Sequence, residues 1–300
     1  MKSVSVEVKV LGGCNLALQQ NALPVIEWIE VKNDGNERLD GLRCSIRCTP
    51  GFIEEKTIEL PALNVGEVYR LNRVDVAMRY DVLLGLSEAV NGTLSFDFVC
   101  NGVDGHPENL CGVRRPLTAY AYDQWLGTEV FPELICSFVT PNLDLVCQLQ
   151  SKVAQELEVA TGSAAICGYQ QGRERAYEIC KAAYRALASW KLQYAEPLAS
   201  FDSVGQRIRL ADKIYMFHLA TCLDSTLLYA SLLEQCGLNP VIIIQKSHAY
   251  IGCHLLDDHF PELPLRDLQQ IRKLSNMDDF TVVETTMLNC PSASLSRQRC

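Results

Sequence analysis

The sequence has 300 residues, of which 48% are hydrophobic, and its 27 basic and 36 acidic residues give a formal net charge of −9. This length suits one large or two ordinary domains, and the apolar content is sufficient for a buried core. The negative charge argues against a nucleic-acid-binding surface, because binding to phosphates needs clustered Lys and Arg. We therefore expect a globular protein that makes no direct contact with nucleic acid.

Residues 1–120 predict an all-β domain. Short alternating or β-branched runs recur at regular spacing, and clusters of turn-forming residues separate them. This pattern is typical of an immunoglobulin-like β-sandwich. The expected strands cover residues 4–10, 25–32, 42–48, 57–60, 67–76 and 92–99.

A joint is expected at residues 121–142, followed by a second domain at residues 143–300. In the joint, Trp125 and its neighbouring tyrosines are expected to pack the two halves together. In the second domain, apolar residues at helical spacing predict three helices. These helices cover residues 143–160, 173–194 and 211–218.

The most informative stretch begins at Cys222, where the apolar spacing predicts a helix that ends before Gly237. The β-branched run at 241–244 predicts a buried strand, and His248 begins the next strand. A last strand is expected at 280–286. Residues 255–279 are expected to form a surface loop that serves as one wall of a cleft. Helices followed by strands indicate an α+β domain.

Three side chains in this region have complementary chemistry. A thiol at a helix start, as predicted for Cys222, is expected to lose its proton more easily. An imidazole such as that of His248 can pair with the thiolate and protonate a leaving group. Glu284 stands in an apolar run, where an unpaired carboxylate is costly, and it is the expected partner of that imidazole. Taken singly, each has an ordinary structural explanation.

This arrangement resembles the transglutaminase-like superfamily of papain-like cysteine enzymes. The motif has a Cys followed two residues later by Asp, then His-Ala-aromatic, then an acidic residue before Thr. Cys222, His248 and Glu284 stand in that order with the matching neighbours, over the second half of the chain. The resemblance implies a helix that carries Cys222, packed on an antiparallel sheet that carries the other two. The family usually has Asp where this chain has Glu284.

Three further residues have expected roles around this site. Gln206 is a candidate oxyanion donor, because papain-like enzymes use a side-chain amide beside the backbone amide of the nucleophile. Asp224 is expected to stabilise the helix start and not to take part in catalysis. Tyr250 is expected to form a wall of the cleft.

The chain lacks the features that would place it in other chemical classes. No apolar run is long enough to span a bilayer, and the first strand lacks the apolar block of a signal peptide, so a cytoplasmic protein without membrane contact is expected. In that compartment the 14 cysteines are expected to be free thiols. Cys253, His254 and His259 lack a second pair of zinc ligands, so neither a metal nor another cofactor is expected.

The combination of a β-sandwich with this second half is also similar to the N-terminal region of large bacterial proteins associated with defence against phage. Those proteins continue into helicase and nuclease domains. The chain has no phosphate-binding loop motif, so such domains would lie outside these residues or on a partner.

The expected function is that of a cysteine-dependent acyl-transfer enzyme, a peptidase or amidase that acts on protein or peptide substrates. The alternative is a catalytically weak or inactive interaction module of a larger helicase–nuclease system. The sequence leaves open whether water or an amine accepts the acyl group.

Overall fold

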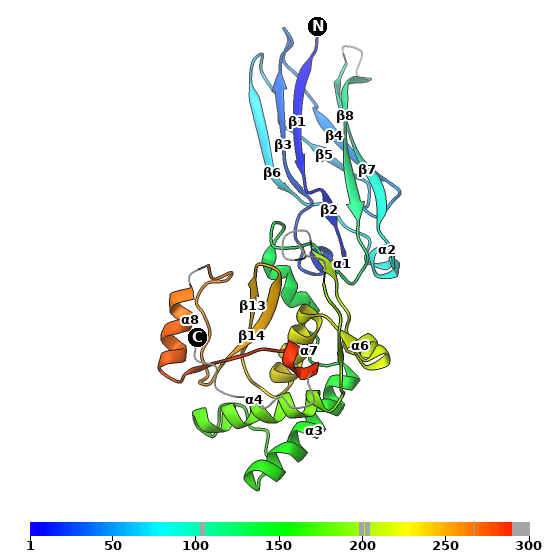
Figure 1. Ribbon diagram of the computed structural model, residues 1–300. Helices are drawn as coiled ribbons and strands as arrows, with labels where there is room; N and C mark the ends of the chain where they lie inside the picture. The colour runs from blue at the N-terminus through cyan, green and yellow to red at the C-terminus, as the bar shows by residue number, and fades with distance from the viewer. Residues whose placement is uncertain (103–105, 198–200, 202–204, 267, 290–300) are drawn as a thin grey trace. The chain divides into compact units, whose positions relative to one another are not determined.

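The computed structural model describes residues 1–102, 106–197, 201, 205–266 and 268–289. The chain divides into two compact units, Met1–Gln124 and Trp125–Cys300 (Figure 1). It combines helices with several β-sheets and belongs to the α+β class. No helix within the described ranges is both long and apolar enough to cross a membrane.

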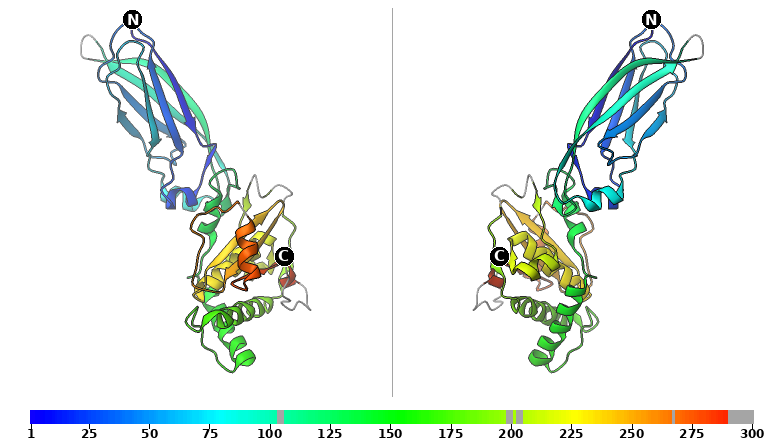
Figure 2. Two further views of the ribbon diagram at one scale, coloured as in Figure 1. Left: turned by 90° about the vertical axis from the view of Figure 1, so that its left-hand side faces the viewer. Right: turned by 90° about the vertical axis from the view of Figure 1, so that its right-hand side faces the viewer.

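The first unit contains two sheets, which Figures 1 and 2 show as two layers. The smaller sheet is antiparallel, with strand order β1-β3-β6. The larger sheet has the order β2-β8-β7-β4-β5, in which only the β2–β8 pair is parallel. The strands are β1 (Val4–Val10), β2 (Gly13–Cys14), β3 (Ile26–Asn33), β4 (Arg43–Thr49), β5 (Lys56–Glu59), β6 (Val68–Val74), β7 (Val90–Asn101) and β8 (Pro107–Ala119).

Strand alternation builds the core of this unit. In β7, Leu94, Phe96 and Phe98 point to one face and are fully buried, as their spacing by two residues requires. Phe96 lies opposite Ile46 on β4, and Phe98 lies opposite Cys44. Each such aromatic residue contributes about 1.5–3 kcal/mol through burial.

The six predicted strands of the first unit are all present, with ends shifted by one or two residues. The prediction missed β8, although its 13 residues make it a long strand. Its sequence contains Pro116 and the adjacent pair Arg114 and Arg115, which obscure the alternation. It also missed two short helices, α1 (Leu16–Gln20) and α2 (Tyr80–Gly85).

Helices occupy most of the first part of the second unit. α7 is its central helix, because every residue from Cys222 to Leu233 is buried. It packs against α3, α4 and two strands of the sheet. The elements are η1 (Pro132–Phe138), α3 (Asp144–Thr161), α4 (Gly172–Ala188), α6 (Ala211–Phe217) and α7 (Cys222–Gln235).

The prediction of a helix over residues 173–194 was wrong at its end. α4 ends at Ala188, and Lys191 adopts a left-handed conformation with a φ of 52° that turns the chain. Residues Gln193–Tyr194 form a short strand, β10, which pairs in parallel with β12 (Leu219–Ala220). β12 ends two residues before Cys222, where α7 begins.

An antiparallel sheet of order β13-β14-β15 completes the second unit. Its strands are β13 (Pro240–Gln245), β14 (His248–His254) and β15 (Phe280–Val283), and η2 (Thr286–Asn289) follows. The expected loop at 255–279 contains a helix, α8 (Leu268–Asn276), which corrects the prediction. Ile271 and Leu274 on this helix pack beside Phe280, and this apolar contact stabilises it.

Candidate active site

Cys222 is the first residue of α7, as the apolar spacing predicted. Thr221 is the N-cap: its side-chain oxygen accepts a hydrogen bond from the Asp224 N–H at 3.1 Å. The Asp224 carboxylate in turn accepts from the Thr221 N–H at 2.9 Å. This reciprocal capping box fixes the helix start and therefore the position of the sulfur atom.

Asp224 also ties the segment before α6 to the start of α7. Its two carboxylate oxygens accept hydrogen bonds from the Arg209 N–H at 2.8 Å and the Arg209 guanidinium at 2.9 Å. The carboxylate is fully buried, and these partners together with Thr221 satisfy it. Its contacts are those of a structural residue.

The Cys222 residue is buried, and the pKa of its thiol depends on this burial and on three hydrogen bonds. The donors are the backbone N–H groups of Ala249 and Leu223 and the hydroxyl of Tyr194. Burial raises the pKa of Cys222, these hydrogen bonds lower it, and the net direction is upward. The expectation that this thiol loses its proton easily is therefore wrong for this conformation, because desolvation outweighs the helix terminus.

His248 and Glu284 are in direct contact. The His248 Nε2 atom lies 2.6 Å from the Glu284 Oε2 atom, and the other carboxylate oxygen accepts from the Thr286 N–H at 2.8 Å and its hydroxyl at 2.7 Å. Burial raises the pKa of Glu284, but the hydrogen bonds from Thr286 and His248 lower it, and its net direction is below the usual range. The carboxylate therefore stays ionised beside the ring. Glu284 follows β15 directly instead of lying within the strand.

Thr285 connects this carboxylate to the helix that carries the thiol. It is fully buried, and its hydroxyl lies 3.2 Å from the Ser225 hydroxyl and 3.0 Å from the Thr226 hydroxyl. Ser225 also donates to the Cys222 carbonyl at 3.1 Å. Residues on α7 thus fix where Glu284 lies. Thr285 follows Glu284 in the motif, and the sequence alone predicts no role for it.

Tyr194 is the residue near the sulfur that the sequence prediction missed. In the parallel β10–β12 pair, Tyr194 lies opposite Ala220, two residues before Cys222. Tyr194 was expected to be the last residue of the helix over residues 173–194. Pro197 restricts only Glu196, so the sequence has no clear signal that the helix ends before Gln193.

Gln206 lies beside the start of α7. It belongs to β11 (Gln206–Arg207), it is buried, and its Nε2 atom donates to the Thr221 hydroxyl oxygen at 3.2 Å. Gly205 precedes it with a φ of +80°, and a Cβ atom there would lie 2.0 Å from the Trp125 carbonyl oxygen, so this approach requires glycine. The oxyanion role of Gln206 remains a prediction.

Tyr250 lies beside the imidazole. Its ring is stacked on that of His248, with centroids 5.9 Å apart and an interplanar angle of 26°. The Gln245 side-chain amide donates to the Tyr250 hydroxyl at 2.7 Å and restrains the ring. Its role as a wall of a cleft remains a prediction.

The residues weighed for zinc have other contacts. Across the described part of the chain, no group of three or more His, Cys, Asp or Glu side chains is placed to hold a metal ion. The Cys253 thiol donates to the His254 carbonyl at 3.3 Å, and the His254 ring packs edge-on against Phe260 and Phe280.

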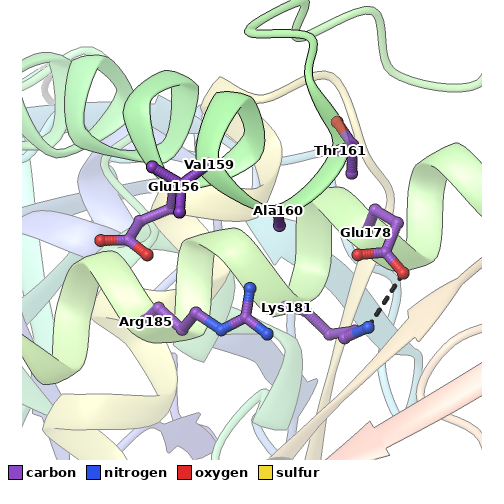
Figure 3. A pocket seen from close by; sticks show the side chains of 7 residues that line it. All are labelled: Glu156, Val159, Ala160, Thr161, Glu178, Lys181 and Arg185. Carbon is purple, nitrogen blue, oxygen red and sulfur yellow. Dashed lines mark hydrogen bonds and ion pairs between the residues drawn. The ribbon is translucent and has the colours of Figure 1, made fainter.

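A pocket of about 600 Å³ lies between the end of α3 and α4 (Figure 3). Two carboxylates and two cations share its lining, and Lys181 pairs with Glu178 at 2.9 Å. The lining includes none of the predicted site residues, so we assign this pocket no part in the proposed chemistry. The residues that line it are Glu156, Val159, Ala160, Thr161, Glu178, Lys181 and Arg185.

Comparisons with known proteins give no family for this chain. No family model matches it, and no curated protein matches it. Among solved structures, it is similar to the crystal structure of a family 76 glycoside hydrolase from a bovine Bacteroides thetaiotaomicron strain, with 11% identity and a TM-score of 0.20. The match covers 79% of this chain and 50% of that chain, so this chain spans half of that protein. A TM-score this low relates neither fold nor activity.

Proposed function

We propose that this protein is a cysteine-dependent acyl-transfer enzyme, a peptidase or amidase that acts on protein or peptide substrates. Cys222 is the nucleophile, His248 the general acid–base and Glu284 the group that orients the imidazole. The observation that carries the proposal is the 2.6 Å contact between His248 and Glu284. The Cys222 thiol accepts a hydrogen bond from the N–H of Ala249, the residue after His248 on β14. A nucleophile, a base and an orienting carboxylate are the parts this chemistry needs.

The mechanism follows from the protonation states. Because its pKa is raised, the thiol is neutral at rest, and the Cys222 proton passes to His248 as the sulfur attacks the carbonyl carbon. The Gln206 amide and the backbone N–H of Cys222 stabilise the oxyanion. The C–N bond then breaks as His248 protonates the amine, and water hydrolyses the thioester that remains. Glu284 holds the ring Nε2 atom throughout.

The finer architecture is part of the same proposal. An immunoglobulin-like sandwich would precede a transglutaminase-like unit, and the sequence resemblance to phage-defence proteins supports a cytoplasmic partner with helicase or nuclease activity. The longer side chain of Glu284, where the family usually has Asp, is accommodated by the two hydrogen bonds from Thr286.

One observation favours the second candidate, an interaction module with a weak or inactive site. The Cys222 side chain is 0% exposed, so the thiol is closed to substrate in this conformation. A module of this kind would retain the contacts of the triad and bind a protein partner without turnover.

One experiment distinguishes the enzyme from the interaction module, and water from an amine as the acyl acceptor. The protein is incubated with a denatured protein mixture and a labelled primary amine, and the products are read by mass spectrometry. We expect new peptide ends without incorporated label, lost in His248→Ala. Amine incorporation without new ends would overturn the hydrolase in favour of crosslinking. The interaction module would be favoured if neither product forms and iodoacetamide alkylates Cys222 as slowly in the wild type as in His248→Ala.

Glu284→Gln is expected to lower kcat by about 10²–10⁴-fold, because a neutral amide does not stabilise the imidazolium that forms during attack. Glu158→Gln, which changes an exposed carboxylate on α3, is the matched control and should leave kcat unchanged. An equal kcat in the two variants would remove Glu284 from the proposed triad.

The same variant tests the pKa of Glu284. Because its folded pKa is lowered, its ionised form stabilises the fold above the usual value of 4.5, and this contribution is lost as pH falls through the lowered pKa. Thermal unfolding followed from about pH 6 to pH 3 should show a smaller loss of Tm in Glu284→Gln than in the wild type. A steeper loss in the variant would contradict the direction of the shift.

A further inference from the structure

We propose that Gln245 is a positioning residue for the proposed reaction: it fixes the Tyr250 ring, and that ring fixes the plane of the His248 imidazole against Glu284. The effect of Gln245 on turnover rests on the proposed function. Its effect on the two rings is a property of the sheet and can be measured without any turnover.

The pairing of β13 with β14 brings these side chains together. Gln245 lies directly opposite His248, and Ile243 lies opposite Tyr250. Because side chains alternate along a strand, His248, Tyr250 and their partners on β13 share one face of the sheet. Gln245 is therefore a diagonal cross-strand neighbour of Tyr250, within the reach of a long side chain.

The contact with Glu284 by itself leaves the imidazole free to tilt. It holds one ring atom, Nε2, at 2.6 Å, and the torsion that turns a histidine ring has a broad range of allowed values. Since Glu284 holds Nε2, the proposed proton transfer uses Nδ1, and the tilt of the ring decides which way this atom points. A second contact, on the face of the ring, is needed to set the tilt.

Tyr250 supplies that contact. Its ring is stacked on the imidazole with an interplanar angle of 26°, and the centroid separation of 5.9 Å lies within the range of aromatic pairs. The same face stabilises the imidazolium that forms during attack, because an aromatic ring attracts a cation within about 6 Å of its centroid. A change in the position of the Tyr250 ring therefore reaches the proposed base.

Gln245 fixes the Tyr250 ring at its polar end. Tyr250 packs against the apolar cluster of Ile243, Phe260 and Phe280. Its hydroxyl accepts a hydrogen bond from the Gln245 side-chain amide at 2.7 Å. The apolar packing and this hydrogen bond together hold the ring in place, so Gln245 acts on the imidazole through Tyr250.

The role of Gln245 is tested first by a double-mutant cycle in turnover. Gln245→Leu, which keeps the size of the side chain and removes the amide, should lower kcat by about three- to tenfold and leave KM within about twofold. Tyr250→Phe keeps the stacked ring and removes the hydroxyl, so it should give a similar loss, and the double variant should lose no more than either alone. Gln148→Leu, which changes an exposed glutamine on α3, is the matched control and should leave kcat unchanged.

The second readout is the NMR spectrum of the His248 ring protons, which needs no turnover. The ring current of Tyr250 shifts these signals, so Gln245→Leu and Tyr250→Phe should both move them, and Gln148→Leu should not. The signals are assigned by their loss in His248→Ala.

Unchanged His248 signals in Gln245→Leu would overturn the proposal, and so would losses of kcat that multiply in the double variant or a loss that appears in KM alone. Should Gln245→Leu fail to fold, Tyr250→Phe decides by the same two readouts. Shifted His248 signals in a protein that forms no new peptide ends would support the positioning role and contradict the proposed function.

Discussion

Cys222→Ala is expected to lower turnover by about 10⁴-fold or more, because no other group takes over the attack on the carbonyl carbon. The loss should appear in kcat, with substrate binding largely retained, since the side chain adds little contact area. It is measured as the rate at which new peptide ends form. The capping box at the start of α7 does not involve the thiol, so the variant should fold.

Cys236→Ala is the matched control for this prediction. Cys236 is also a buried cysteine, it lies at the other end of α7, and it is outside the proposed site. Its replacement should leave kcat unchanged. Full turnover in Cys222→Ala, or an equal loss in both variants, would show that the reaction does not pass through this thiol.

Asp224→Ala is expected to lower the free energy of unfolding by about 3 kcal/mol, which is large for a single polar residue. The substitution leaves three donors without their acceptor: the Thr221 N–H, the Arg209 N–H and the Arg209 guanidinium. It also removes the carboxylate from the capping box. The value is measured by urea unfolding at neutral pH.

Asp212→Ala tests whether this cost is specific to the buried carboxylate. Asp212 also lies in the first turn of a helix, α6, but it is exposed. Its replacement should change the free energy of unfolding by less than about 0.5 kcal/mol. Similar urea midpoints for the two variants would contradict the structural role that we assign to Asp224.

Local pattern was sufficient for the elements that carry the proposed triad. The apolar spacing after Cys222 predicted α7, the β-branched run predicted β13, and the contact between His248 and Glu284 followed the expected order of elements. These elements are long or uniform enough to have a period. The position of Glu284 after an apolar run predicted its contact with His248, because a buried carboxylate needs a partner.

Tertiary contacts determined what the sequence did not predict. β10 has only two residues, so it has no period, and it forms by pairing with β12, whose residues lie 26 positions further along the chain. The direction of the Cys222 pKa shift depends on how completely the fold buries the thiol, which no local pattern contains. α8 depends on apolar contacts with Phe280, and β8 on pairing with β7.

The buried hydroxyl of Thr285 has a mechanical consequence. It joins the residue after Glu284 to Ser225 and Thr226, within one turn of Cys222. These two hydroxyl contacts couple the position of Glu284 to that of the end of α7 that bears Cys222.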